Sequence, residues 1–181
     1  MRVGCKSLAI LLWACGAVFA QMAKGPVNLD FKEGEPGQVP KGWLNPTRTT
    51  GFPAAATEQC SRPGARCAVL RSEPAASPAP FGNPMQALDA TAYRNKQIRF
   101  RASVRVETAG GGRAQLWVRV DRGNGQMGFF DNMGDRRITS AEWRPYEIAG
   151  EVSEDATGIF FGMMLVGAGA VRLRPPLPPE R

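Results

Sequence analysis

Hydrophobic and polar side chains alternate along residues 114–121, whose sequence is Ala-Gln-Leu-Trp-Val-Arg-Val-Asp. In a β-strand this pattern sends alternate side chains to opposite faces of a sheet. The apolar set suits a buried core and consists of Leu116, Val118 and Val120. The other face then carries an aromatic ring beside an amide, a cation and a carboxylate, from Gln115, Trp117, Arg119 and Asp121. We therefore expect Trp117 to be exposed together with its polar neighbours, as part of a recognition surface.

Short apolar or alternating runs continue along the chain, separated by Gly, Pro, Asn and Asp clusters, and no stretch of helical period is long enough to predict a helix. We predict strands near residues 27–31, 67–72, 85–89, 97–107, 114–121, 126–130, 144–152, 158–166 and 171–174. Residues 122–125 are typical of a hairpin turn, and residues 87–93 suit a single helical turn. The run 159–166 has no polar alternate, so it should lie in the middle of a covered sheet. The sequence therefore predicts an all-β fold, a two-sheet antiparallel β-sandwich.

The predicted strand over residues 97–107 turns a basic face outward. Its inward set is Ile98, Phe100, Ala102, Val104 and Val106, and its outward set is Arg99, Arg101, Ser103 and Arg105. A row of three arginines could hold an anionic polymer. The commoner role of such a row is a solvated face, or protection of a sheet edge against aggregation, and we favour that interpretation.

Residues 1–20 have the layout of a secretory signal peptide, with two basic residues, an apolar run over 8–20 and no acidic residue. We expect cleavage after Ala20 and a secreted or periplasmic protein without a transmembrane anchor. As a helix the apolar run would reach only about 20 Å, against a hydrocarbon core of about 30 Å. An alternative is lipid attachment at Cys15. The predicted domain covers residues 21–174, followed by an extended, mobile Pro-rich tail over 175–181.

Cleavage would leave Cys60 and Cys67 as the remaining cysteines, on either side of a Pro-Gly turn. In an exported protein such a pair predicts a disulfide. The rival metal site lacks further ligands, because the chain contains no histidine. The net charge of +7 is spread along the sequence rather than clustered. We therefore expect a protein that does not bind nucleic acid. We also expect a monomer.

The absence of histidine also excludes Ser/His and Cys/His nucleophile arrangements. No phosphate-binding loop or dinucleotide fingerprint is present. A carboxylate-dependent hydrolase is the remaining enzymatic alternative, with candidate residues Asp121, Asp131, Asp135, Glu142, Glu147 and Glu151. Their spacing picks out no pair. We therefore expect no catalytic activity and no cofactor.

Two clusters are candidates for binding. The first adds Asp131 and Asn132 to Gln115, Trp117, Arg119 and Asp121, because the turn at 122–125 should bring these segments side by side. Aromatic faces stack on sugars, and amide, carboxylate and guanidinium groups fix hydroxyl positions. The alternative is that Trp117 is buried and Arg119 pairs with Asp121 or Asp131.

The second cluster offers oxygen ligands for a structural calcium ion, from Asn28, Asp30 and Glu33. Three side chains do not complete a calcium site. The default role of such residues is to form turns.

The chain resembles a known class of domains through the order and spacing of short motifs: residues 28–34, Pro40–Trp43, 114–121, Phe130–Met133, Asp135–Arg136, Ser140–Trp143 and Ile159–Leu165 with Gly167. These resemble a bacterial secreted galactose-binding-like jelly roll, the architecture of many carbohydrate-binding modules. Such modules occur alone or as accessory domains beside peptidases or regulators. The resemblance implies a sugar- or peptide-binding domain that often holds calcium.

The chain departs from that pattern at its end, where Val171–Arg174 is followed by prolines instead of an acidic pair. Because proline cannot donate to a ladder, the last strand should end by Arg174. We expect a non-catalytic module with a carbohydrate partner. A competing hypothesis is an adaptor to an envelope component, through exposed apolar surface around Phe129, Trp143 and Tyr146.

Overall fold

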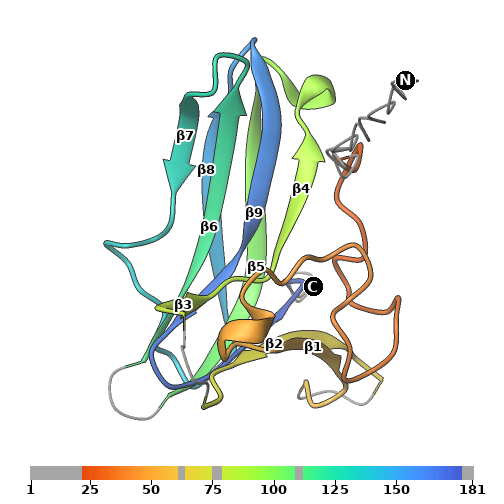
Figure 1. Ribbon diagram of the computed structural model, residues 1–181, viewed down its shortest axis with the longest axis vertical. Coiled ribbons are helices and arrows are strands. Elements are labelled where there is room, and N and C mark those ends of the chain that lie inside the picture. Colours follow the sequence, from red (N-terminus) through yellow and green to blue (C-terminus); the bar gives the residue numbers. More distant parts are fainter. Residues whose placement is uncertain (1–21, 61–63, 75–78, 109–111, 177–181) are drawn as a thin grey trace, which may run out of the picture.

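Two antiparallel sheets pack face to face in the computed structural model, which describes residues 22–60, 64–74, 79–108 and 112–176. Sheet 1 has the strand order β1-β2-β10-β5-β8. Sheet 2 has the order β3-β9-β6-β7, with β4 also paired to β9. Figure 1 shows the two layers, with the segment that precedes β1 running beside β4. The predicted two-sheet antiparallel β-sandwich is confirmed.

The strands are β1 Ala54–Thr57, β2 Cys67–Arg71, β3 Phe81–Gly82, β4 Met85–Asp89, β5 Lys96–Thr108, β6 Arg113–Arg122, β7 Met127–Asp131, β8 Arg144–Val152, β9 Ala156–Val166 and β10 Gly169–Arg174. Two 3₁₀ turns, η1 Arg48–Thr50 and η2 Thr91–Tyr93, complete the elements. Eight of these strands match the predicted positions to within two residues. The last strand ends at Arg174 as predicted.

The predicted strand at 27–31 is wrong. Asn28 and Phe31 have φ angles of 48° and 58°, which an extended strand does not allow. The Asn28 side chain organises this loop instead: its amide donates to the carbonyls of Glu33 and Lys41, and its oxygen accepts from the Glu33 N–H. The sequence also missed β1 and β3, because Ala54–Thr57 shows no alternation of polarity and β3 is only two residues long.

The core lies between the sheets and is built from the predicted inward sets. Leu116, Val118 and Val120 are 0–2% exposed, and they meet Val104 and Val106 of sheet 1 in the same cluster. Strand β9 lies in the middle of sheet 2, between β4 and β6, as the absence of a polar alternate predicted. On its outer side Phe160 and Met164 are half-buried. Strand parity was therefore predicted correctly for β5 and β6.

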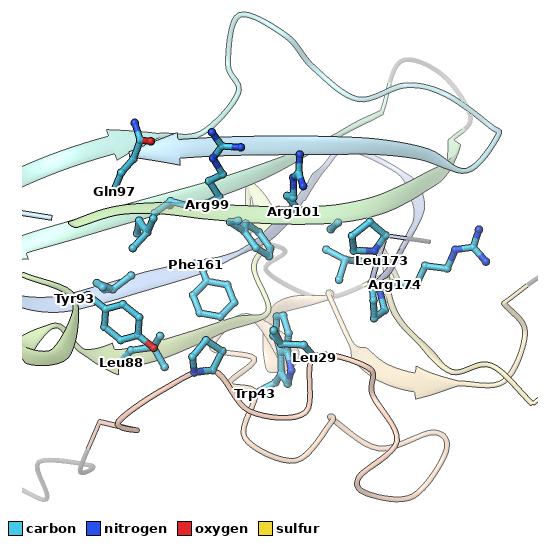
Figure 2. A pocket seen from close by; sticks show the side chains of 18 of the residues that line it. Leu29, Trp43, Leu88, Tyr93, Gln97, Arg99, Arg101, Phe161, Leu173 and Arg174 are labelled. Atoms are coloured by element: carbon cyan, nitrogen blue, oxygen red, sulfur yellow. The ribbon is translucent and has the colours of Figure 1, made fainter. Parts of the chain in front are cut away.

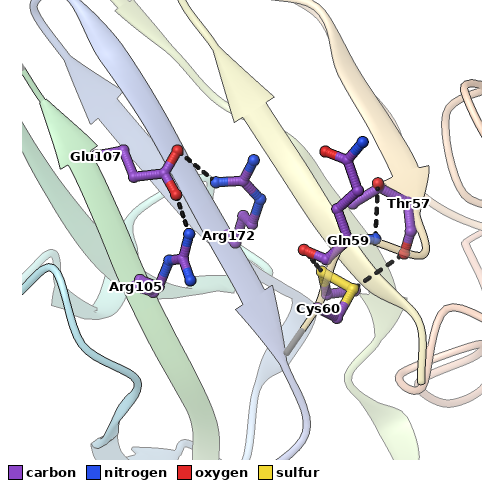
Figure 3. Close-up of a disulfide and its surroundings, with 7 residues drawn as sticks. Thr57, Gln59, Cys60, Arg105, Glu107 and Arg172 are labelled. Atoms are coloured by element: carbon purple, nitrogen blue, oxygen red, sulfur yellow. Dashed lines mark hydrogen bonds and ion pairs between the residues drawn. A yellow bond between two sulfur atoms is a disulfide. The ribbon is translucent and has the colours of Figure 1, made fainter. Parts of the chain in front are cut away.

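The predicted disulfide is present, and it joins Cys60 to Cys67 at the start of β2 (Figure 3). Residues 1–21 and 177–181 lie outside the described part of the chain, and with them the signal peptide, its cleavage site, Cys15 and most of the predicted tail. Within the residues that the structure describes, no helix is long and apolar enough to cross a membrane.

Candidate functional site

Trp117 points away from the space between the sheets, as strand parity predicted, but it is not exposed. Its neighbours Leu116 and Val118 belong to the core cluster, whereas Trp117 does not. The side chain nevertheless retains only 7% of its exposure, and the indole N–H donates to Asn83 Oδ1 at 2.8 Å. The expectation of an exposed indole was therefore wrong.

A glycine on the neighbouring strand explains how Trp117 comes to be covered. Gly162 lies opposite Trp117 in the β6–β9 ladder. A Cβ on Gly162 would lie 2.2 Å from the Pro84 carbonyl oxygen, so only glycine lets the β3–β4 connection approach this closely. Asn83 precedes Pro84 in that connection, and the close approach brings its side chain to the indole. The cover therefore comes from a segment more than thirty residues away in the sequence.

The remaining predicted ligand residues are divided between two faces of sheet 2. Gln115 is 6% exposed and donates to the backbone carbonyl of Asn132, and the Asn132 side chain accepts from the Gly134 N–H. Asp131 pairs with Val118 in register and therefore shares the inner face. The six predicted residues thus do not form one exposed cluster, and their role in binding stays a prediction.

Asp131 is held in its charged form. Partial burial raises its pKa, but hydrogen bonds from Arg136 and from the Met133 N–H outweigh this effect and leave the pKa below its usual value. A general acid near neutral pH needs the opposite shift. Asp131 therefore acts as an anchor for the loop that follows β7.

Two phenylalanines and one arginine form a row across the outer face of sheet 2. Of these three residues, the sequence pattern predicted only Arg119 for this face. Arg119 lies opposite Phe130 of β7 and opposite Phe160 of β9. Residues directly opposite each other share a face, so the three side chains form one row across three strands, here called the aromatic row. Phe130 is 48% exposed. In this row Phe130 offers exposed apolar surface beside the guanidinium group, and the half-buried Phe160 ring lies under it.

The Arg119 side chain is fixed from two directions. Its Nε and Nη2 atoms donate to the two oxygens of Asp121, both at 2.6 Å. Its guanidinium carbon also lies 5.5 Å from the centroid of the Phe160 ring. The hydrogen bond with Asp121 raises the pKa of Arg119 further, so the guanidinium group stays charged. The alternative in which Arg119 pairs with Asp121 is confirmed.

Phe160 lies against its own strand because its neighbour Gly158 has no side chain. A Cβ on Gly158 would come within 2.9 Å of the Phe160 ring. The sequence contains Phe130 and Phe160, but parity alone did not assign them to the site. The pairing of β6 with β7 sets Phe130 opposite Arg119, and the pairing of β6 with β9 sets Phe160 opposite Arg119. The β6–β7 register shifts at a bulge between Val120 and Asp121.

The candidate catalytic carboxylates are separated by the fold. Asp121 and Asp131 lie on opposite faces of sheet 2, and each is engaged by an arginine. Arginines also pair with Asp135, Glu142 and Glu147. The two-carboxylate arrangement of a glycosidase is not formed by Asp121 and Asp131.

The surface expected for an adaptor is not an exposed apolar patch. Phe129, Trp143 and Tyr146 are all half-buried. Phe129 and Tyr146 pack against the core, and Trp143 lies under Arg174 with 4.4 Å between the guanidinium carbon and the ring centroid.

The proposed calcium ligands are engaged in turns and ion pairs. Asp30 pairs with Lys32 at 3.3 Å, and Glu33 pairs with Lys41 at 3.0 Å. In the described part of the chain, no group of three or more Asp, Glu or Cys side chains could hold a metal ion. These side chains are engaged in turn hydrogen bonds and ion pairs, and a calcium ion at this loop stays a prediction.

A cavity of about 460 Å³ opens where the segment before β1 covers the sandwich (Figure 2). Trp43, Tyr93 and Phe161 contribute aromatic walls, and Leu29 and Leu88 contribute aliphatic ones. Gln97, Arg99 and Arg101 also border it, but Figure 2 shows that their side chains point away from it. The cavity is therefore mainly apolar and offers few groups that could recognise sugar hydroxyls.

Carbohydrate-binding modules share this fold. The C-terminal family 22 module of Clostridium thermocellum Xyn10B matches with a TM-score of 0.57 and 12% identity, over 80% of this chain and 87% of that one. A xylan-binding domain of family 22 matches with a TM-score of 0.56 and 12% identity, over 80% of this chain and 86% of that one. A family 16 carbohydrate-binding module matches with a TM-score of 0.54 and 12% identity, over 74% and 86%. The protein thus has the jelly-roll β-sandwich fold of these modules, the fold that its sequence motifs indicated.

The chain is also similar to part of a longer protein, the uncharacterized HTH-type transcriptional regulator YbfP of Bacillus subtilis. The two are 33% identical over 133 residues, which are 72% of this chain and 45% of YbfP. The chain thus spans less than half the length of this relative. No protein-family model matches the chain.

Proposed function

We propose that this protein is a non-catalytic carbohydrate-binding module whose contact surface is the outer face of sheet 2, centred on the aromatic row. The observation that carries the proposal is the row itself, in which Phe130 and Phe160 flank Arg119 across three strands. Aromatic faces stack on the apolar C–H faces of sugar rings. A row that extends across a sheet suits a polymer rather than a single buried sugar.

The Arg119–Asp121 pair supplies the polar part of this surface. The Asp121 side chain is 22% exposed and that of Arg119 is 48% exposed, so the pair remains accessible to a ligand. Together they offer donors and acceptors that are already oriented, which lowers the entropy cost of binding. Trp117 lies on the same face of β6 as Arg119, where the β3–β4 connection covers it, so we assign it a supporting role.

Two of the comparisons support this proposal. Solved domains with the same fold include a xylan-binding one, which makes a polysaccharide the first ligand class to test. Similarity to part of a protein described as a transcriptional regulator supports a binding rather than a catalytic role. We propose, in addition, that the chain is exported, because its disulfide needs an oxidising compartment to persist.

The test is affinity electrophoresis of the mature protein in gels that contain xylan or another neutral polysaccharide. Phe130→Ala should abolish most of the retardation, and Leu44→Ala, which removes a side chain of 52% exposure outside the row, should not. Equal retardation of wild type and Phe130→Ala in every gel that retards the wild type would contradict the proposed surface. Absence of retardation in a broad panel, with the protein folded, would contradict the proposed ligand class.

A further inference from the structure

A second polar surface lies on the opposite side of the sandwich, on the outer face of sheet 1. The sequence left two interpretations for Arg99, Arg101 and Arg105, an anion-binding row or protection of a sheet edge. In the structure β5 pairs with β8 over Lys96–Val104 and with β10 over Ser103–Thr108. Each of these arginines therefore lies on a stretch of β5 with one paired neighbour strand, and what they share is the outer face of sheet 1.

Strand pairing adds arginines that the sequence did not place with this row. Arg172 of β10 lies directly opposite Arg105, and Arg174 lies opposite Ser103. On the next strand, Arg71 lies opposite Ala170 of β10, so it also shares this face. We call the resulting set the arginine face: Arg71, Arg99, Arg101, Arg105, Arg172 and Arg174.

Carboxylates neutralise only part of this charge, because each of two glutamates is shared by two arginines. Glu107 accepts from Arg105 and from Arg172, the latter pair at 2.7 Å (Figure 3). Hydrogen bonds from Arg172 and then from Arg105 lower the pKa of Glu107. Glu147 similarly pairs with Arg99 and Arg101. The face therefore keeps a surplus of positive charge.

The arginines also keep unused hydrogen-bonding capacity. Within the described residues, the Nε atoms of Arg105 and Arg172 are buried without a hydrogen-bond partner. Like charges directly opposite each other in a ladder are destabilising. The cross-strand pair Arg105–Arg172 thus has a cost that Glu107 offsets only in part, and additional anions at this face would reduce it.

The arrangement of the charges indicates the shape of the ligand. Arg99, Arg101 and Arg105 lie along one strand, about 7 Å and about 13 Å apart in turn, because Ser103 stands between the last two. The side chains of Arg99 and Arg101 are 57% and 61% exposed, so a ligand can reach them. Guanidinium groups bind carboxylates in a two-pronged geometry. A linear polymer with regularly spaced carboxylates fits such a track.

We propose that the arginine face is a second binding site, for the carboxylate groups of an acidic polysaccharide such as a polyuronate. This inference rests on the proposed function only in that the ligand is a polysaccharide, and it uses a different surface. Nucleic acid fits less well, because binding of single strands depends on aromatic side chains on which bases stack. The aromatic ring described at this face, Trp143, already packs against Arg174.

The experiment measures binding of the mature protein to polygalacturonate and to its fully methyl-esterified form, which has the same backbone without the charge. The wild type should bind the first and not the second, and added salt should weaken the binding. The double variant Arg99→Gln/Arg101→Gln should weaken binding about tenfold, since it removes two exposed ion pairs with the ligand. Both side chains are exposed, so this variant should fold.

The matched control removes two charges elsewhere, as Arg48→Gln/Arg137→Gln, from exposed positions in η1 and in the loop after β7. An equal loss in this control would overturn the proposal in favour of a nonspecific charge effect. Equal retention of single-stranded DNA, with the same dependence on Arg99 and Arg101, would overturn it in favour of a general polyanion site. The proposed function is tested by a different result: if it fails, Phe130→Ala leaves retardation in neutral polysaccharide gels unchanged, whatever the outcome with polygalacturonate.

Discussion

Replacement of Trp117 distinguishes a ligand contact from a structural support. With 7% of its exposure left, the side chain buries about 200 Å². At about 25 cal/mol per Å² this corresponds to an upper limit of about 5 kcal/mol, in the range measured for the truncation of buried aromatic residues. We expect Trp117→Ala to lower the free energy of unfolding by about 3–4 kcal/mol. For a domain of this length the thermal midpoint should fall by about 10 °C.

The indole hydrogen bond can be measured separately with Trp117→Phe and Asn83→Ala. Trp117→Phe keeps an aromatic ring but leaves Asn83 Oδ1 without its donor, and should cost about 1–2 kcal/mol. Asn83→Ala removes the acceptor. In the double variant the two losses should overlap by about 1 kcal/mol, because the same hydrogen bond is removed twice.

The assay is urea unfolding followed by tryptophan fluorescence and circular dichroism, with polysaccharide retardation measured on the same samples below the transition. If the free energy of unfolding of Trp117→Ala lies within about 0.5 kcal/mol of the wild-type value and retardation is lost selectively, then the indole is an exposed ligand contact and not a structural support. Strong destabilisation with retardation retained in the remaining folded protein supports the role described here.

Three further predictions concern stability. Replacing Cys60 and Cys67 by serine should lower the free energy of unfolding by about 2.5 kcal/mol in the chain-entropy model, because the disulfide closes a short loop with a sequence separation of 7. Urea unfolding under oxidising and reducing conditions measures this loss. An equal response of wild type and variant to reductant would contradict the prediction. Asp131 has a lowered pKa in the fold, so its carboxylate stabilises the protein above the usual value of 3.8 and this contribution is lost as the pH falls through the folded value; Asp131→Asn should therefore be less stable than wild type at pH 7, with a smaller difference below about pH 4. Glu107→Gln leaves Arg105 opposite Arg172 without its shared carboxylate, so it should destabilise the protein and the loss should shrink in high salt; a loss that is independent of salt would contradict this.

The sequence predicted the layers of the sandwich well, because strand parity is a local property. The alternation in β5 and β6 assigned Val104 and Val118 to the core, and the Pro-Gly turn between the cysteines indicated the disulfide. The strand predicted at 27–31 failed because Asn28 and Phe31 adopt positive φ angles that apolar alternation does not reveal.

The candidate site was predicted only in part. Strand parity correctly predicted that Trp117 points away from the core. It does not predict the contact with Asn83, which reaches the indole because Gly162 allows the β3–β4 connection to approach. The same limitation applies to the aromatic row. Phe130 and Phe160 flank Arg119 through pairings of β6 with β7 and β9, and both of these registers shift near the end of β6.

By itself, then, the sequence determined the all-β class, the inward and outward faces of its main strands, and the cysteine pair. Only the tertiary structure decided which strands became neighbours: β10 beside β5, which sets Arg172 against Arg105, and β9 beside β6, which sets Phe160 against Arg119. The physical reason is that side-chain alternation arises within a single strand from the pleat of the backbone. Strand order and register depend instead on burial and hydrogen bonding summed over segments far apart in the chain.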